Sequence, residues 1–240
     1  MLARSCAAVI LAVGLTATAS AVTVTVSVPA TSDLWLAGMP SGATASLGDV
    51  APTHSPVLVT GLPLTSGHVL RFSATGLTDH CDTGGRCGLA GPEGDLIEPS
   101  VQHTTGAENG IADIFAPIDS LIGVFLDSTQ PSLSPATSFL DFSTLALRDF
   151  AALSPLLKQP FFIGDGFRND GTTVQSFFIP SGATRLFLGT MDGFGWYDNT
   201  GSLSVTVTEA LSPAPVPEPG TLALLAGGLL GLGVARRRWQ

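Results

Sequence analysis

The chain has 240 residues, 45 % of them hydrophobic, and a formal net charge of −9 from 19 acidic and 10 basic side chains. Four of the basic residues lie near the two ends, so the segment between them is more acidic still. This charge excludes nucleic acid as an expected partner, because phosphate contacts need a basic face. The length between the ends suits one domain.

Residues 1–21 predict a secretory signal peptide. Arg4 supplies a positive start, Cys6–Leu15 is apolar, and Ala19–Ala21 offers a small-residue cleavage site before Val22. A buried N-terminal helix is the alternative, but the segment has no polar face. We therefore expect export and a folded domain over residues 22–210.

Short β-branched and aromatic runs, bounded by Gly, Pro, Asp and Ser, recur through that domain and predict an all-β sandwich. Residues 180–183 read as a hairpin turn, and a helical turn is expected near Leu145–Leu153 within the irregular stretch 128–160. The expected strands are Val22–Val28, Leu34–Gly38, Val57–Leu62, Val69–Ala74, Leu121–Leu126, Phe161–Gly164, Phe177–Pro180, Arg185–Thr190 and Ser202–Thr208.

Two cysteines of the domain, Cys81 and Cys87, are separated by five residues that include Gly84 and Gly85. In an oxidising compartment we expect them to form a disulfide around this tight loop. Two free thiols are the alternative. A zinc site with the neighbouring His80 is disfavoured, because a fourth ligand is missing nearby.

The segment richest in candidate ligands is the loop that follows the strand at 185–190. Asp192, Asp198 and Asn199 provide hard oxygen donors within eight positions, and glycines between them allow backbone carbonyls to turn inward. Calcium prefers six to eight oxygens from such mixed sets. Trp196 and Tyr197 lie in the same loop, as in sites that pack a sugar on an aromatic ring. An ordinary Asp/Asn/Gly loop with a packed Trp is the alternative.

This loop resembles the C-terminal loop of the PA-I galactophilic lectin (PA-IL-like) family, which has an Asp, a Gly- and aromatic-containing stretch, then Asn-Asn-Ser-Gly-Ser and a final strand. Here Asp192 is followed by Asp198-Asn199-Thr200-Gly201-Ser202. The resemblance implies a galactose-binding-like jelly roll. It also implies a Ca²⁺ ion held by Asp192, Asp198, Asn199, the His80 carbonyl and a carbonyl at Gly195 or Trp196.

Two other segments carry the same resemblance. Ala74–His80, which follows the strand VLRFS, matches the family's post-strand loop, where an aromatic residue offers its carbonyl to calcium and where this chain has His80. Gly91–Asp95 with Glu98-Pro99 matches a Gly-Pro-x-Gly-Asp segment followed by a His-Pro that touches galactose. The resemblance implies that a sugar is bound. Because Glu98 replaces the His that touches galactose, it does not imply that this sugar is galactose. The implied sugar contacts are His80, Glu98, Pro99, Asp192, Trp196 and Asp198.

No enzyme signature is present, so we expect binding without catalysis. The four histidines are scattered, and neither a Gly-x-Ser-x-Gly elbow nor an H-E-x-x-H motif occurs. Glu93, Asp95 and Glu98 leave a glycosidase carboxylate pair as an alternative. Phe162–Gly171 has a composition like that of a calcium loop, but it lacks the Glu of an EF-hand, and a plain turn is favoured.

The C-terminus combines a Pro-rich linker (211–219), the apolar stretch Thr221–Ala235 and the basic residues Arg236, Arg237 and Arg238. A 15-residue helix covers about 23 Å, less than the roughly 30 Å of a hydrocarbon core. The motif Pro217-Glu218-Pro219, followed by the apolar stretch and the basic residues, resembles the PEP-CTERM sorting signal of bacteria that secrete extracellular polysaccharide. The resemblance implies a transient sorting helix at 220–240 in the inner membrane and processing by an exosortase-type protease. A plain C-terminal anchor is the alternative.

Together these features predict an exported protein that resides at the cell surface or in the extracellular matrix. Its expected function is lectin-like, calcium-dependent binding of carbohydrate, associated with exopolysaccharide. The alternative is a structural matrix protein in which calcium stabilises the loop and no sugar is bound.

Overall fold

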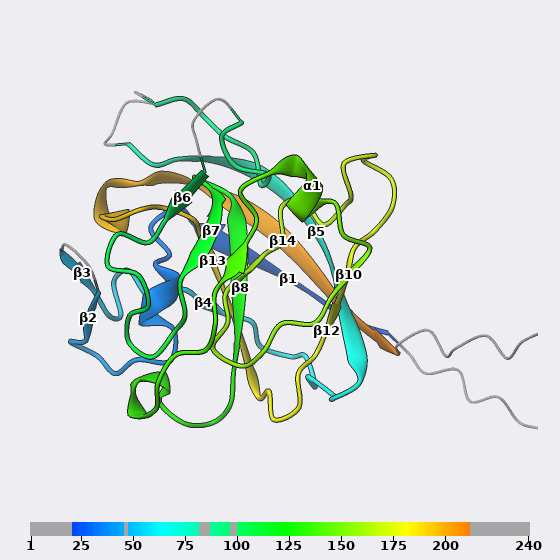
Figure 1. Ribbon diagram of the computed structural model, residues 1–240, viewed down its shortest axis with the longest axis horizontal. Coiled ribbons are helices and arrows are strands. Elements are labelled where there is room, and N and C mark those ends of the chain that lie inside the picture. The colour runs from blue at the N-terminus through cyan, green and yellow to red at the C-terminus, as the bar shows by residue number, and fades with distance from the viewer. Residues whose placement is uncertain (1–20, 46–47, 82–86, 97–99, 212–240) are drawn as a thin grey trace, which may run out of the picture.

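The computed structural model describes residues 21–45, 48–81, 87–96 and 100–211 (Figure 1). Residues 1–20 of the predicted signal peptide, residues 212–219 of the linker, the predicted sorting helix, and the residues Glu98 and Pro99 lie outside these ranges. A search of the described part for a helix of sufficient length and hydropathy to cross a membrane finds none.

Two sheets contain most of the strand residues in the described ranges, and helices are few and short there, which confirms the all-β class. The larger sheet has the order β1 (Val22–Pro29), β14 (Thr200–Leu211), β5 (His68–Asp79), β12 (Ser176–Phe178) and β10 (Ala152–Leu153). The second has the order β11 (Phe161–Phe162), β8 (Leu121–Leu126), β13 (Arg185–Thr190) and β4 (Val57–Leu58).

Smaller elements complete the described fold. One small sheet pairs β2 (Thr44–Ala45) with β3 (Asp49–Val50), and another has the order β6 (Ser100–Gln102), β7 (Ile114–Pro117) and β9 (Leu140–Asp141). The helical elements are η1 (Leu34–Leu36), η3 (Pro131–Leu133), α1 (Leu145–Arg148) and η4 (Trp196–Asp198).

Strand β14 lies between β1 and β5 in the larger sheet and pairs antiparallel with both (Figure 1). Its residues alternate between the two faces of the sheet, as a strand requires. Leu203, Val205 and Val207 are buried, whereas on the outer face Thr206 Oγ1 lies 3.0 Å from Thr25 Oγ1 of β1. The register therefore follows directly from the period-two pattern of the sequence.

One hydrophobic core joins the two sheets. Strand β8 is buried along its whole length, as expected for a central strand covered on both faces. Aromatic rings from both sheets meet there. Phe177 of β12 contacts Phe72 of β5 edge-on, with ring centroids 5.1 Å apart, and lies 5.4 Å from Phe161 of β11. Each such buried side chain contributes roughly 2–3 kcal/mol to folding.

Two local predictions are corrected, and the predicted helical turn is confirmed over a shorter range. Leu34–Gly38 contains the 3₁₀ turn η1 in place of a strand, because Asp33 Oδ1 accepts a hydrogen bond from Trp35 N at 2.8 Å and caps the turn. Residues 180–183 do turn, but they join β12 to β13, which belong to different sheets, so no hairpin forms. The helical turn α1 ends at Arg148, and β10 follows it as an edge strand parallel to β12.

Candidate functional site

The loop between β13 and β14 is anchored in the core by Trp196. This side chain is fully buried, its Nε1 donates to the Thr190 carbonyl at 2.9 Å, and its ring lies 5.5 Å from that of Trp35. Its backbone N donates to Asp49 Oδ2 at 3.0 Å. The expectation that the Trp196 ring packs on a sugar is therefore corrected, because the ring is buried in the core, where it anchors the loop, and does not face solvent.

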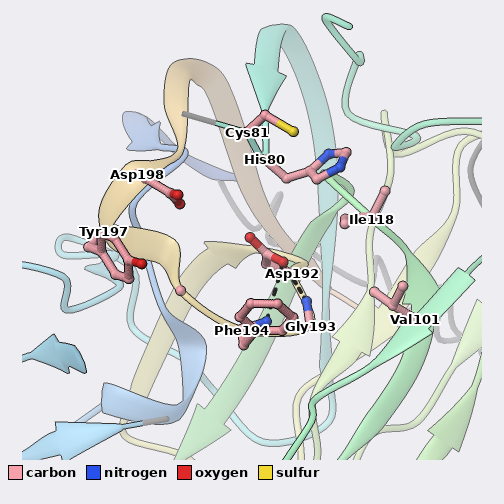
Figure 2. A pocket seen from close by; sticks show the side chains of 10 residues that line it. His80, Cys81, Val101, Ile118, Asp192, Gly193, Phe194, Tyr197 and Asp198 are labelled. Carbon is pink, nitrogen blue, oxygen red and sulfur yellow. Dashed lines mark hydrogen bonds between the residues drawn. The ribbon is translucent and has the colours of Figure 1, made fainter. Parts of the chain in front are cut away.

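The same loop forms one wall of a pocket of about 300 Å³. The pocket is lined by His80, Cys81, Val101, Ile118, Asp192, Gly193, Phe194, Gly195, Tyr197 and Asp198. Figure 2 shows Asp192 at its centre, between Asp198 of the loop and His80 from the end of β5. The structure thus brings together three of the residues predicted to serve the site. The aromatic rings available to a ligand are those of Phe194 and Tyr197, which are 55 % and 56 % exposed.

The buried side-chain oxygens near the loop that have no hydrogen-bond partner include Asp192 Oδ2, Asn199 Oδ1 and Asp79 Oδ2. The other Asp192 oxygen accepts from Gly193 N at 2.6 Å and Phe194 N at 3.3 Å, and Asn199 Nδ2 donates to the Ala30 carbonyl at 3.3 Å. A buried polar atom left unsatisfied costs about 1–3 kcal/mol. These acceptors therefore fit a hydrogen-bond donor or a cation that supplies the missing contacts.

Asp79 was not predicted as a site residue. It ends β5 and pairs with Thr200 of β14, so it lies next to Asn199 at the exit of the loop. Its Oδ1 accepts from Cys81 N at 2.9 Å, which leaves Oδ2 unpartnered. The signal available in the sequence was its position beside His80, but only the β5–β14 register places it near Asn199.

The positions of the candidate backbone ligands are consistent with a metal site. The Gly195 carbonyl accepts from Asp198 N at 3.5 Å, and the Trp196 carbonyl accepts from Asn199 N at 3.2 Å. Each carbonyl has a second lone pair, so these bonds leave room for a cation. Gly195 adopts φ +79°, a left-handed conformation that glycine reaches without strain and that starts the 3₁₀ turn η4.

His80 is held by a buried acid. Its Nδ1 lies 2.6 Å from Asp119 Oδ2, and the Asp119 side chain is almost fully enclosed. Asp119 N in turn donates to the Met191 carbonyl at 2.7 Å, directly before Asp192. The pair therefore fixes the end of β5 against the β13–β14 loop. Sequence reasoning missed Asp119 because it is 39 residues from His80.

Cys81 and Cys87 form a disulfide, with Cα atoms 5.7 Å apart. Within the described ranges, one group of three His, Cys, Asp or Glu residues has its ligand atoms within 4.8 Å of one another: His80, Cys81 and Cys87. Because the disulfide occupies both sulfurs, this group lacks the thiolates that zinc requires. The carboxylates of Asp79, Asp192 and Asp198 form no such group, so a cation there would draw on Asn199 and the carbonyls as well.

Burial raises the pKa of Asp192 from its ordinary 3.8 to about 6, against the opposing effects of the neighbouring Asn199 side chain and of the hydrogen bonds from Phe194 N and Gly193 N. A calcium ion at this carboxylate must compete with the proton. We expect calcium affinity to fall by about tenfold per pH unit as the pH drops below about 6 and Asp192 becomes protonated. Calcium titrations between about pH 5 and pH 8 test this, and an affinity constant across that range would contradict it.

The comparisons with known proteins concern the C-terminus. A family model, the PEP-CTERM protein-sorting motif, matches residues 215–238, a span that contains the predicted sorting residues from Pro217 to Arg238. A search of curated proteins finds no match. The sorting prediction is thereby confirmed, and the chain carries the signal of an exported exosortase substrate that is sorted through the membrane to the cell surface.

Proposed function

We propose that this surface-sorted protein binds carbohydrate through a calcium ion held at the β13–β14 loop. The observation that carries the proposal is the set of buried, unpartnered oxygens of Asp79, Asp192 and Asn199 at that loop. Carboxylate, amide and carbonyl oxygens are the ligands that calcium prefers. The two main sheets around one core also agree with the proposed galactose-binding-like jelly roll.

In this proposal Asp79, Asp192, Asp198 and Asn199 supply side-chain oxygens, and His80 with Gly195 or Trp196 supplies carbonyls. Calcium takes six to eight ligands, so sugar hydroxyls complete the shell when the ion is bound. Trp196 holds the loop in place from the core. Phe194 and Tyr197 take the ring-packing role first expected of Trp196, because both are exposed at the pocket.

The partner follows from location and chemistry. A protein that its sorting motif delivers to the cell surface meets the glycans of the surrounding matrix. The net charge of −9 disfavours nucleic acid as the partner. We therefore propose extracellular polysaccharide as the ligand. A structural matrix protein is the second candidate, because calcium alone would also satisfy the unpartnered oxygens and stabilise the loop.

The exposed aromatic residues give a test that separates sugar binding from calcium binding. Tyr197→Ala is expected to lower sugar affinity by about three- to tenfold and to leave calcium affinity unchanged, because the ring contacts sugar and not the ion. Phe139→Ala is a matched control, since Phe139 is also exposed, at 53 %, but does not line this pocket. Titrations of both variants with calcium and with the bound sugar measure the two affinities.

Immobilised glycans test the proposal as a whole. The 21–211 segment, which contains every strand described above, is applied to a glycan panel with calcium and again with EDTA. Retention on a defined subset of glycans that EDTA abolishes is the expected result. Calcium binding in solution without retention on any glycan would replace the lectin proposal with the structural one.

A further inference from the structure

A second pocket, of about 320 Å³, brings together two acidic segments that are far apart in the sequence. The turn Gly91–Asp95 supplies Glu93, and the loop after β11 supplies Asp165, 72 residues later. The lining residues are Glu93, Leu96, Leu145, Asp165, Phe167, Arg168, Asn169 and Gly171. None of them belongs to the first pocket.

Hydrogen bonds fix the two acids against each other. Glu93 Oε1 accepts from Asp165 N at 2.9 Å, and Asp165 Oδ1 accepts from Phe167 N at 2.8 Å. Gly164 has φ +60°, and a Cβ there would lie 2.0 Å from Glu93 Oε1, so only glycine allows this approach. Burial, with the neighbouring Asp165, raises the pKa of Glu93.

The lining has the mixed chemistry that a sugar ring requires. Leu96 and Leu145 are exposed and Phe167 is half-buried, which provides apolar surface for the C–H face of a ring. The carboxyl groups and the Asn169 amide can meet hydroxyls. The positive charge of the Arg168 guanidinium is neutralised by Asp149, because the guanidinium donates to both carboxylate oxygens of Asp149 at 3.1 and 2.8 Å. The pocket therefore combines apolar surface with hydrogen-bonding groups.

A cation fits this pocket less well than a sugar. The loop Phe162–Gly171 has the composition of a calcium loop, but its Asp170 does not line the pocket. The Asp170 carboxylate instead accepts from Thr172 N at 2.8 Å and from Thr173 N at 2.7 Å, so it caps its own turn. These bonds hold the Asp170 carboxylate against the backbone of its own turn.

The two pockets are joined by one packed segment. Asp95 N donates to the carbonyl of Ile118 at 2.8 Å, and Ile118 lines the first pocket. Leu121 N donates to the Pro92 carbonyl at 2.9 Å, beside Glu93. The turn that builds the second pocket is therefore tied directly to the wall of the first.

We infer that the pocket between Glu93 and Asp165 is a second carbohydrate subsite, which takes another residue of the glycan chain held at the β13–β14 loop. The inference rests on the proposed function and deepens it: the ligand is an oligosaccharide or polysaccharide and not a single sugar. A ligand that occupies two linked sites binds more tightly than one that occupies either site alone.

The test compares monosaccharides with matched tetrasaccharides. Galactose, glucose, mannose and N-acetylglucosamine, and a tetramer of each, are titrated into the 21–211 segment with calcium and with EDTA. For a sugar that binds, the tetramer is expected to bind at least about tenfold more tightly than the monomer. Glu93→Gln and Phe167→Ala should each remove most of that gain and leave monomer and calcium affinities unchanged. Phe139→Ala is the control, and thermal unfolding verifies that each variant folds.

The outcomes separate the inference from the function on which it rests. A tetramer gain that is absent in the wild type, or that both folded variants retain, overturns the subsite and leaves the calcium site standing. Tetramer binding that survives EDTA and is lost in Phe167→Ala supports the subsite while overturning calcium dependence. Binding of neither monomers nor tetramers overturns both.

Discussion

Asp192→Ala is expected to lower calcium affinity at least about a hundredfold and to abolish calcium-dependent sugar binding. Substitutions of residues that merely orient metal ligands already cost about ten- to hundredfold. Asp192 is a proposed direct ligand, and its Oδ2 is buried and unpartnered at the centre of the first pocket. Isothermal titration with calcium measures the change. Asp141→Ala is the matched control, because Asp141 is an exposed acid outside the pocket.

The Asp192 variant should remain folded. Burial raises the pKa of this carboxyl, so without calcium its ionised form lowers the stability of the folded state. Alanine carries no charge and removes this destabilisation. A thermal midpoint in EDTA no lower than that of the wild type is therefore expected. Unchanged calcium affinity in the folded variant would remove Asp192 from the site and with it the proposed ligand set.

Calcium is expected to stabilise the wild-type fold by about 4 kcal/mol at a thousandfold excess over its dissociation constant. For a domain of this size that corresponds to a rise of about 8–16 °C in the thermal midpoint. The effect should be larger near neutral pH than near pH ~4. The folded pKa of Asp192, about 6, exceeds its ordinary 3.8, so this group stabilises the calcium-free fold at low pH and that contribution is lost as the pH rises through about 6.

Circular dichroism melts in calcium and in EDTA, at several pH values, measure this effect. The Asp192→Ala variant should lose most of the calcium-dependent rise, which ties the stabilisation to the loop. A midpoint that is the same in calcium and in EDTA at neutral pH would contradict the calcium site. A rise that persists in full in the variant would place the ion elsewhere in the chain.

The strands could be predicted wherever a local run of apolar residues determines them. Leu121–Leu126 and Arg185–Thr190 begin and end as expected, because each is an apolar run that fills a central strand. The small sheets escaped prediction, since β2, β3 and β9 have two residues each and show no period. At Leu34–Leu36 the polar cap of Asp33 overrides an apolar run that otherwise suits a strand.

The site could be predicted from the sequence only in part, and for a similar reason. The donors of one loop, Asp192 and Asp198, are recognisable because they are close together in the chain and the resemblance singles them out. Whether an aromatic residue in that loop faces solvent or the core depends on tertiary packing, which reversed the expectation for Trp196 and revealed Phe194. Contacts between distant residues, such as His80 with Asp119, leave no local pattern at all.

A crystal structure of the 21–211 segment grown with calcium and a glycan identified by the panel tests the central claim most directly. We expect one calcium ion in contact with Asp192 Oδ2 and Asn199 Oδ1, at the roughly 2.3–2.6 Å typical of calcium–oxygen bonds, with sugar hydroxyls completing its shell beside Tyr197. A loop without an ion at saturating calcium, or a glycan bound away from the ion, would contradict the account.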